Sequence, residues 1–186
     1  MGWLDALLGR SKPAKPNLDT LFALPSAAVT LQAATGFVPT GVGSVCFRAA
    51  EGGAFATLEQ DIKALLGDAQ IEQSNDSYGY TWLLARRPPD DLSSLVTDLH
   101  GVNSSLETAG FGPSLLCSLV TFKDRSDRRL AVVYLYKQGT FYPFAPLPGQ
   151  RRDNALELQV RGVLGGELPI EPDLSRWFPL WGAPGL

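Results

Sequence analysis

The sequence contains few of the residues from which catalytic and metal sites are usually built. Its 186 residues include one histidine, two cysteines and one methionine, and the formal net charge is −3. One histidine excludes a site made from several histidines of one chain. The lack of a basic excess argues against nucleic-acid binding, which depends on positive charge. No apolar run approaches the roughly 18–20 residues that cross a membrane.

The remaining composition is that of an ordinary globular protein, with 45% hydrophobic and 19% charged residues. The first residues, MGWLDALLGR, lack the charged region, long apolar region and cleavage site of a signal peptide, which predicts a cytoplasmic protein. Cys46 and Cys117 lie in apolar, strand-like runs. We expect buried, reduced thiols there, with a disulfide or a reactive site as the alternative.

Composition divides the chain into three segments. The first, residues 1–16, is an amphipathic segment followed by a Pro-rich linker with three basic residues, and its apolar side carries Trp3, Leu4, Leu7 and Leu8. Residues 17–170 have the patterns of one α+β domain. Residues 171–186 form an aromatic, Pro-rich tail. The first segment could touch a membrane surface weakly, which would place the protein at the periphery of the inner membrane.

Hydrophobic spacing predicts an antiparallel sheet of about five or more strands, with helices mainly on one face. Helical spacing begins near Phe55, where Thr57 and Gln60 suggest a capping box, and again after Asp90, a good N-cap. A last helix begins at about Asp153 or Asn154. Strand-like runs joined by short turns lie between these helices, so neighbouring strands should pair antiparallel. The arrangement is similar to that of type III secretion chaperones.

The aromatic tail needs a covering surface, which either its own domain or a partner protein could supply, and folding back onto the domain is favoured for Trp177. Its prolines, Pro172, Pro179 and Pro184, prevent one continuous helix. We expect Trp177 to be buried beside the last helix, over Leu158, and Trp181 to be partly exposed.

Three groups of residues are candidates for function, each with a structural alternative. Aromatic residues of the predicted strands could line a pocket or form ordinary sheet core: Tyr78, Tyr80, Trp82, Tyr134 and Tyr136. Arginine pairs could form a basic patch or lie scattered at strand ends: Arg86, Arg87, Arg128, Arg129, Arg151 and Arg152. His100 could be a general base, but the sequence indicates no partner for it, so a structural histidine is favoured.

Long stretches of the chain resemble a known family. They include DSYGYTWLL, LVTDLHGVNSSLETAGFGPSLLCSLVTF, VYLYKQGTFYPFAP, RRDNALELQVRGVLG and LPIEPDLSRWFPLWGAPGL. These are similar to the PspAB family, the PspA-associated proteins of bacteria. The resemblance implies an accessory protein of the phage-shock envelope-stress system, whose PspA is a coiled-coil protein that binds and remodels the inner membrane. It supplies no catalytic residues.

The main functional hypothesis is a non-enzymatic adaptor without a cofactor, which contacts PspA or another envelope-stress protein. The residues expected to make these contacts are apolar side chains near the two ends of the chain: Trp3, Leu4, Leu7, Leu8, Trp177, Phe178 and Trp181. One alternative is a small-ligand binder or enzyme with an aromatic pocket on the sheet. Another is a chaperone-like homodimer.

Overall fold

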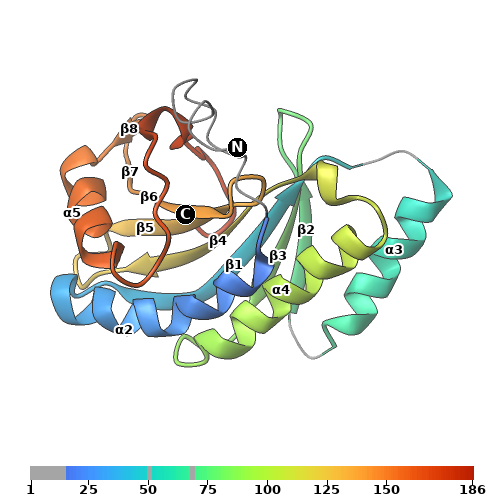
Figure 1. Cartoon of the computed structure of the whole chain (residues 1–186), viewed down its shortest axis with the longest axis horizontal. Helices are drawn as coiled ribbons and strands as arrows, with labels where there is room; N and C mark the ends of the chain where they lie inside the picture. The colour runs from blue at the N-terminus through green and yellow to red at the C-terminus, as the bar shows by residue number, and fades with distance from the viewer. Residues whose placement is uncertain (1–15, 50–51, 68–69) are drawn as a thin grey trace, which may run out of the picture.

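A computed structural model describes residues 16–49, 52–67 and 70–186. It contains a six-stranded antiparallel sheet with the strand order β2-β3-β1-β4-β5-β6 (Figure 1). These strands are β1 (Val38–Phe47), β2 (Gln70–Asn75), β3 (Thr81–Arg86), β4 (Leu115–Lys123), β5 (Arg129–Leu135) and β6 (Thr140–Phe144). A small second sheet pairs β7 (Pro146–Leu147) with β8 (Arg151–Arg152). The predicted α+β class is confirmed.

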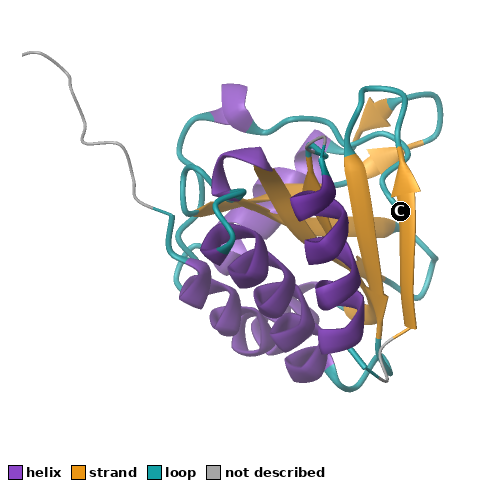
Figure 2. Cartoon of the chain, turned by 90° about the vertical axis from the view of Figure 1, so that its right-hand side faces the viewer, coloured by secondary structure: helices purple, strands orange, loops and turns teal. Residues whose placement is uncertain are grey.

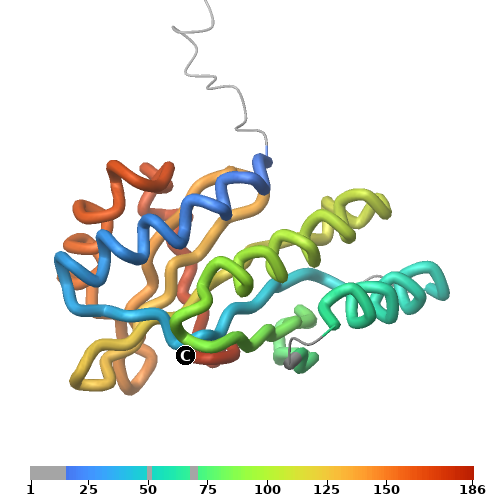
Figure 3. The backbone as a smooth tube through the Cα atoms, turned by 90° about the horizontal axis from the view of Figure 1, so that it is seen from below, coloured from blue at the N-terminus to red at the C-terminus, as the bar shows by residue number. Residues whose placement is uncertain are grey.

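The helices lie on one face of the large sheet, which we call the helix side (Figure 2). They are α2 (Leu24–Thr35), α3 (Gly53–Leu65), α4 (Leu92–Thr108) and α5 (Asn154–Leu164), with short 3₁₀ turns η1 (Leu18–Ala23), η2 (Gly112–Ser114) and η3 (Leu174–Arg176). Figure 3 shows α2, α4 and α3 side by side. No helix among the described residues is long and apolar enough to cross a membrane.

Amphipathic spacing accounts for the helix side. The apolar side chains of α4 form one stripe along the helix, and all of them are buried: Leu92, Leu95, Val96, Leu99, Val102 and Leu106. It packs on β1 at the centre of the sheet. The helix-side cluster also takes in the buried stripes of α2, α3 and α5, so a single core lies between the helices and the sheet.

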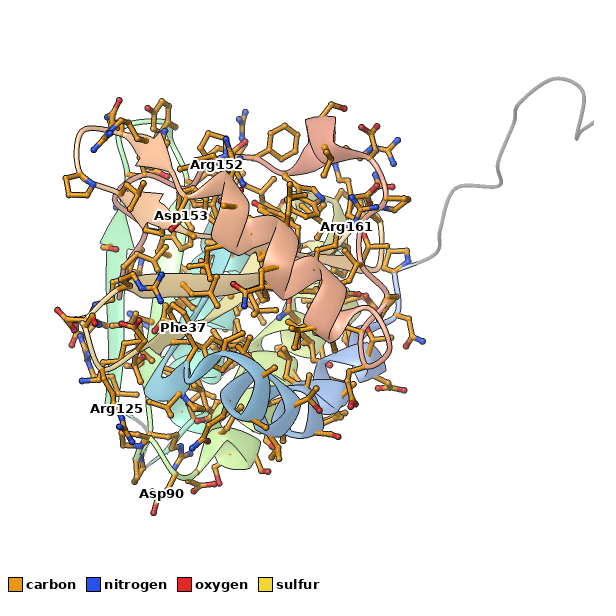
Figure 4. The ribbon with its side chains drawn as sticks, turned by 90° about the vertical axis from the view of Figure 1, so that its left-hand side faces the viewer. Phe37, Asp90, Arg125, Arg152, Asp153 and Arg161 are labelled. Carbon is orange, nitrogen blue, oxygen red and sulfur yellow. The ribbon has the colours of Figure 1, made fainter. Side chains whose placement is uncertain are left out.

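Three predicted boundaries are wrong. The N-cap of α4 is Asp91, whose side chain accepts from the amide of Ser94, and Asp90 lies exposed in the turn before it (Figure 4). Helix α3 begins at Gly53, so Thr57 lies inside the helix and donates back to the Gly53 carbonyl. Strand β3 begins only at Thr81, because the chain turns at residues 76–80 before entering the sheet.

The opposite face of the sheet, which we call the tail side, is covered by residues 171–186. The C-terminus lies on this side (Figure 2). Trp177 is buried as expected, but it packs against Tyr142 of β6 rather than over Leu158. Leu158 remains half exposed on α5. The tail therefore covers the second face of the sheet, whereas the sequence pattern had placed Trp177 beside the last helix.

Candidate functional site

A cavity of about 370 Å³ lies between the tail and the sheet. Its lining residues come from β1, the turn before β3, β3 itself, the start of β4, the end of β5, the middle of β6 and the tail. Its described lining is largely apolar and aromatic: Cys46, Asp76, Tyr78, Tyr80, Trp82, Leu116, Cys117, Leu135, Tyr142, Phe178, Pro179, Leu180 and Trp181. Its volume and lining are typical of sites that bind small molecules or single side chains.

Aromatic packing holds the tail over the sheet. The rings of Trp177 and Tyr142 stack with centroids 6.1 Å apart, and Trp181 meets Phe144 edge to face at 5.1 Å. The Tyr142 hydroxyl donates to the carbonyl of Phe178 at 2.8 Å. The tail is thus fixed by Trp177 while Trp181, only half buried, forms part of the cavity wall.

Arg152 connects the tail to α5 (Figure 4). Its Nε donates to the buried Glu157 carboxylate at 2.9 Å, and another guanidinium nitrogen donates to the carbonyl of Trp177. The guanidinium carbon also lies 5.1 Å from the ring centre of Phe144. Because Glu157 accepts from the amide of Ala145 as well, one buried carboxylate links α5, the chain after β6 and the tail.

Asp76 is held rigidly at the cavity wall by the turn before β3. One carboxylate oxygen accepts from the amides of Tyr78 at 2.8 Å and Tyr80 at 3.0 Å. The other accepts from the indole nitrogen of Trp82 at 3.0 Å. Desolvation raises the pKa of Asp76, but these hydrogen bonds outweigh it and the net pKa is lowered. The carboxylate is therefore charged at neutral pH.

Cys46 and Cys117 are directly opposite each other on β1 and β4 and line the cavity. Both are buried and free, as predicted. The hydrogen bond to Cys117, together with burial, raises the pKa of Cys46. A thiol held protonated is a poor nucleophile, so Cys46 behaves as part of the apolar lining.

The structure brings together some of the predicted pocket residues and separates others. Tyr78, Tyr80 and Trp82 line the cavity. Tyr134 and Tyr136 point to the helix side, where Tyr134 accepts from the amide of Asn17 and Tyr136 donates to Glu107.

Sequence reasoning missed the other described residues of the lining: Cys46, Asp76, Leu116, Cys117, Leu135, Tyr142, Pro179 and Leu180. Strand alternation carries a partial signal for the strand residues among them, because Leu135 is one position away from both Tyr134 and Tyr136 and so faces the other side of the sheet.

The arginine pairs carry partners of their own. Arg86 pairs with Glu72, Arg87 with the buried Asp98, Arg128 with Asp124, Arg129 with Asp127 and Arg152 with Glu157. The Nε of Arg151 donates to the carbonyl of Pro148. These contacts favour the structural alternative for the pairs.

His100 has partners that the sequence did not indicate. Its Nε2 lies 3.1 Å from an Asp19 carboxylate oxygen, and its Nδ1 lies 3.3 Å from the Ser104 hydroxyl. Its ring also packs 4.6 Å from that of Phe22. Since Asp19 and Phe22 belong to η1, the histidine joins this turn to α4.

Among the residues predicted to make protein contacts, Phe178 is 51% exposed and Trp181 is half buried at the cavity. Trp177 is buried and so contacts its own domain. The remaining candidates, Trp3, Leu4, Leu7 and Leu8, lie outside the described residues.

Comparison with known proteins gives one match. The family model described as "PspAB: PspA associated protein B" matches residues 1–185, which confirms the resemblance drawn from the sequence. Neither the curated proteins nor the solved structures gave a match.

Proposed function

Because the chain belongs to the PspAB family of PspA-associated proteins, we propose that it is a non-enzymatic accessory protein that binds a PspA-type protein by direct contact. The family description supports the association, and the structure supplies a candidate surface for it. That surface is the cavity on the tail side together with its exposed aromatic rim.

The main support for this surface is its aromatic rim, which consists of Tyr78, Phe178 and Trp181. Phe178 is 51% exposed and Tyr78 is 73% exposed, and both line the cavity, as does the half-buried Trp181. Large apolar side chains around a preformed hollow are typical of the anchor points of protein interfaces. Complete burial of one such side chain contributes about 1.5–3 kcal/mol. A partner side chain that enters the cavity would bury several of these groups at once.

The test is affinity for a purified PspA-type partner, measured by isothermal titration calorimetry with the full chain. Phe178→Ala and Trp181→Ala should each weaken binding by about tenfold or more, as for interface anchors. Leu158→Ala and Phe22→Ala are matched controls, because these side chains are 50% and 49% exposed but lie away from the cavity lining.

Unchanged affinity in both rim variants would contradict the proposed surface. Equal losses in the rim and control variants would show that exposed apolar area, rather than this site, determines binding.

A small-ligand binder is the second candidate function, and the cavity itself favours it. At about 370 Å³ it is large enough for a small apolar molecule. Native mass spectrometry of protein purified from its natural host cell would distinguish the two functions. A stoichiometric small molecule, lost in Trp181→Ala, would favour this second candidate.

A further inference from the structure

We propose that the tail-side cavity binds a basic side chain, lysine or arginine, of the protein partner. This inference rests on the proposed function and specifies the chemistry of the group that enters the cavity. Three observations carry it: a fixed carboxylate, aromatic walls and an apolar floor.

Asp76 supplies the negative charge. It is the one charged residue among the described residues that line the cavity. No ion pair to Asp76 occurs within residues 16–49, 52–67 and 70–186. Its three hydrogen bonds come from neutral donors, which leave the negative charge in place and keep the carboxylate ionised. A partner cation would therefore find a positioned counter-charge.

Aromatic walls favour the same kind of group. The rings of Tyr80, Trp82 and Trp181 line the same cavity as Asp76. The faces of aromatic rings carry negative electrostatic potential and attract cations. Tyr80 already shows this property, because the guanidinium carbon of Arg48 lies 5.2 Å from its ring centre. Arg48 itself is not among the residues that line the cavity.

The apolar part of the lining favours a lysine or arginine side chain over a small cation without an apolar stem. Leu116, Leu135 and Leu180 lie in the lining with the two thiols. Lysine and arginine carry their charge on an apolar stem, which can pack on such side chains while the charged end reaches a polar group. A carboxylate or phosphate group would instead meet Asp76 and be repelled.

The first experiment uses three probes with one apolar stem and different charge: n-hexylammonium, 1-hexanol and hexanoate. Each is titrated into the ¹⁵N-labelled full chain, and the indole N–H signals of the tryptophans are followed by NMR. We expect n-hexylammonium to bind about 3- to 30-fold tighter than 1-hexanol, and hexanoate to bind weakest. The signals of Trp82 and Trp181 should shift, whereas that of the buried Trp177 should shift least.

The second experiment removes the charge. Asp76→Asn should reduce the affinity for n-hexylammonium to that for 1-hexanol and leave 1-hexanol binding unchanged. Asp173→Asn is the matched control, because Asp173 also accepts hydrogen bonds within a turn but lies outside the lining. Trp82→Phe removes the indole donor while keeping the charge, so it should retain the preference for ammonium and separate charge from turn geometry.

Equal affinity for n-hexylammonium and 1-hexanol in the wild-type chain overturns the inference, as does tighter binding of hexanoate or no binding of any probe. Affinity for the PspA-type partner separates this failure from that of the proposed function. If Phe178→Ala and Trp181→Ala weaken partner binding but Asp76→Asn does not, the proposed binding surface is supported. The proposal that a basic side chain enters the cavity is then wrong. If none of the three variants changes partner affinity, both proposals are wrong.

Discussion

The two faces of the sheet are covered in different ways. On the helix side, four amphipathic helices lie over the strands and bury one large apolar cluster. On the tail side, a smaller cluster is covered by a segment whose regular structure is limited, among residues 171–186, to the short turn η3. The cavity of about 370 Å³ and two exposed aromatic side chains, Phe178 and Tyr78, lie on this second side.

The difference follows from the covering elements. A helix presents side chains at regular spacing, so a sheet and a helix can interdigitate along their whole length. The tail contains Pro172, Pro179 and Pro184, and its side chains reach the sheet at irregular intervals. The side chain of Trp177 is buried against the sheet, whereas the side chains of Leu180 and Trp181 are only partly buried. The irregular cover therefore leaves the cavity between the tail and the sheet.

The largest effect on stability should come from Trp177, the tail residue that is buried as completely as a core residue of the helix side. Trp177→Ala removes a buried ring and should lower the free energy of unfolding by about 3–5 kcal/mol. Trp181→Ala should cost distinctly less, because its ring is only half buried. Urea denaturation of both variants measures this. If both variants lost several kcal/mol of unfolding free energy, the whole tail would be part of the core. If neither variant lost stability, the tail would not stabilise the domain.

The next effect concerns the connection between the two sides. Arg152→Ala leaves the buried Glu157 without its cation and removes a donor to the Trp177 carbonyl. We expect a loss of about 2–3 kcal/mol, below the value for fully buried pairs because Arg152 keeps some solvent contact. Arg128→Ala breaks the more exposed pair with Asp124 and should cost about 1 kcal/mol or less. Urea denaturation that gave the same loss for both variants would contradict the tethering role of Arg152.

The smallest effect compares tyrosines of the two sides at alkaline pH. Burial raises the pKa of Tyr142 on the tail side above its ordinary value of 10.0, and burial with the hydrogen bond to Glu107 does the same for Tyr136 on the helix side. Above pH 10 the unfolded chain loses protons that the folded chain keeps. The stabilisation is therefore complete below pH 10 and decreases as the pH rises beyond it.

Tyr142→Phe and Tyr136→Phe should each flatten this decrease, as measured by denaturation between pH 8 and 11. At neutral pH, Tyr142→Phe should cost about 0.5–1.5 kcal/mol for its hydrogen bond to the tail. Only Tyr142→Phe should also change the fluorescence of Trp177, because the ring of Tyr142 stacks on that indole. A steep decrease above pH 10 that survives in both variants would mean that other groups cause it.

Local patterns predicted the helix side well. The stripe of α4, the hairpin of β4 and β5 and the helix beginning at Asn154 all follow from spacing within about 20 residues. The shift from Asp90 to Asp91 shows the limit of such rules, because two adjacent aspartates are equally suitable caps and only the backbone geometry selects one.

The tail side could not be predicted in the same way because it depends on contacts between distant segments. The pairing of Cys46 with Cys117 is fixed by the register of two strands that are far apart in the chain. The position of Trp177 depends on Tyr142 being presented by β6 on the face without helices. The side on which Tyr134 and Tyr136 lie depends on which face the helices cover, and a single strand does not encode this.

The central position of β1 has a consequence for the order of assembly. This strand pairs with β3 and β4, both of which follow it in the chain. The β2–β3 hairpin and the β4–β5–β6 meander close over short connections and can form early, whereas β1 must wait for pairings that span long loops. Until then its apolar run, VGSVCF, has two unpaired edges. During synthesis this stretch is therefore open to pairing with other chains, and we expect its late pairing with β4 to slow folding.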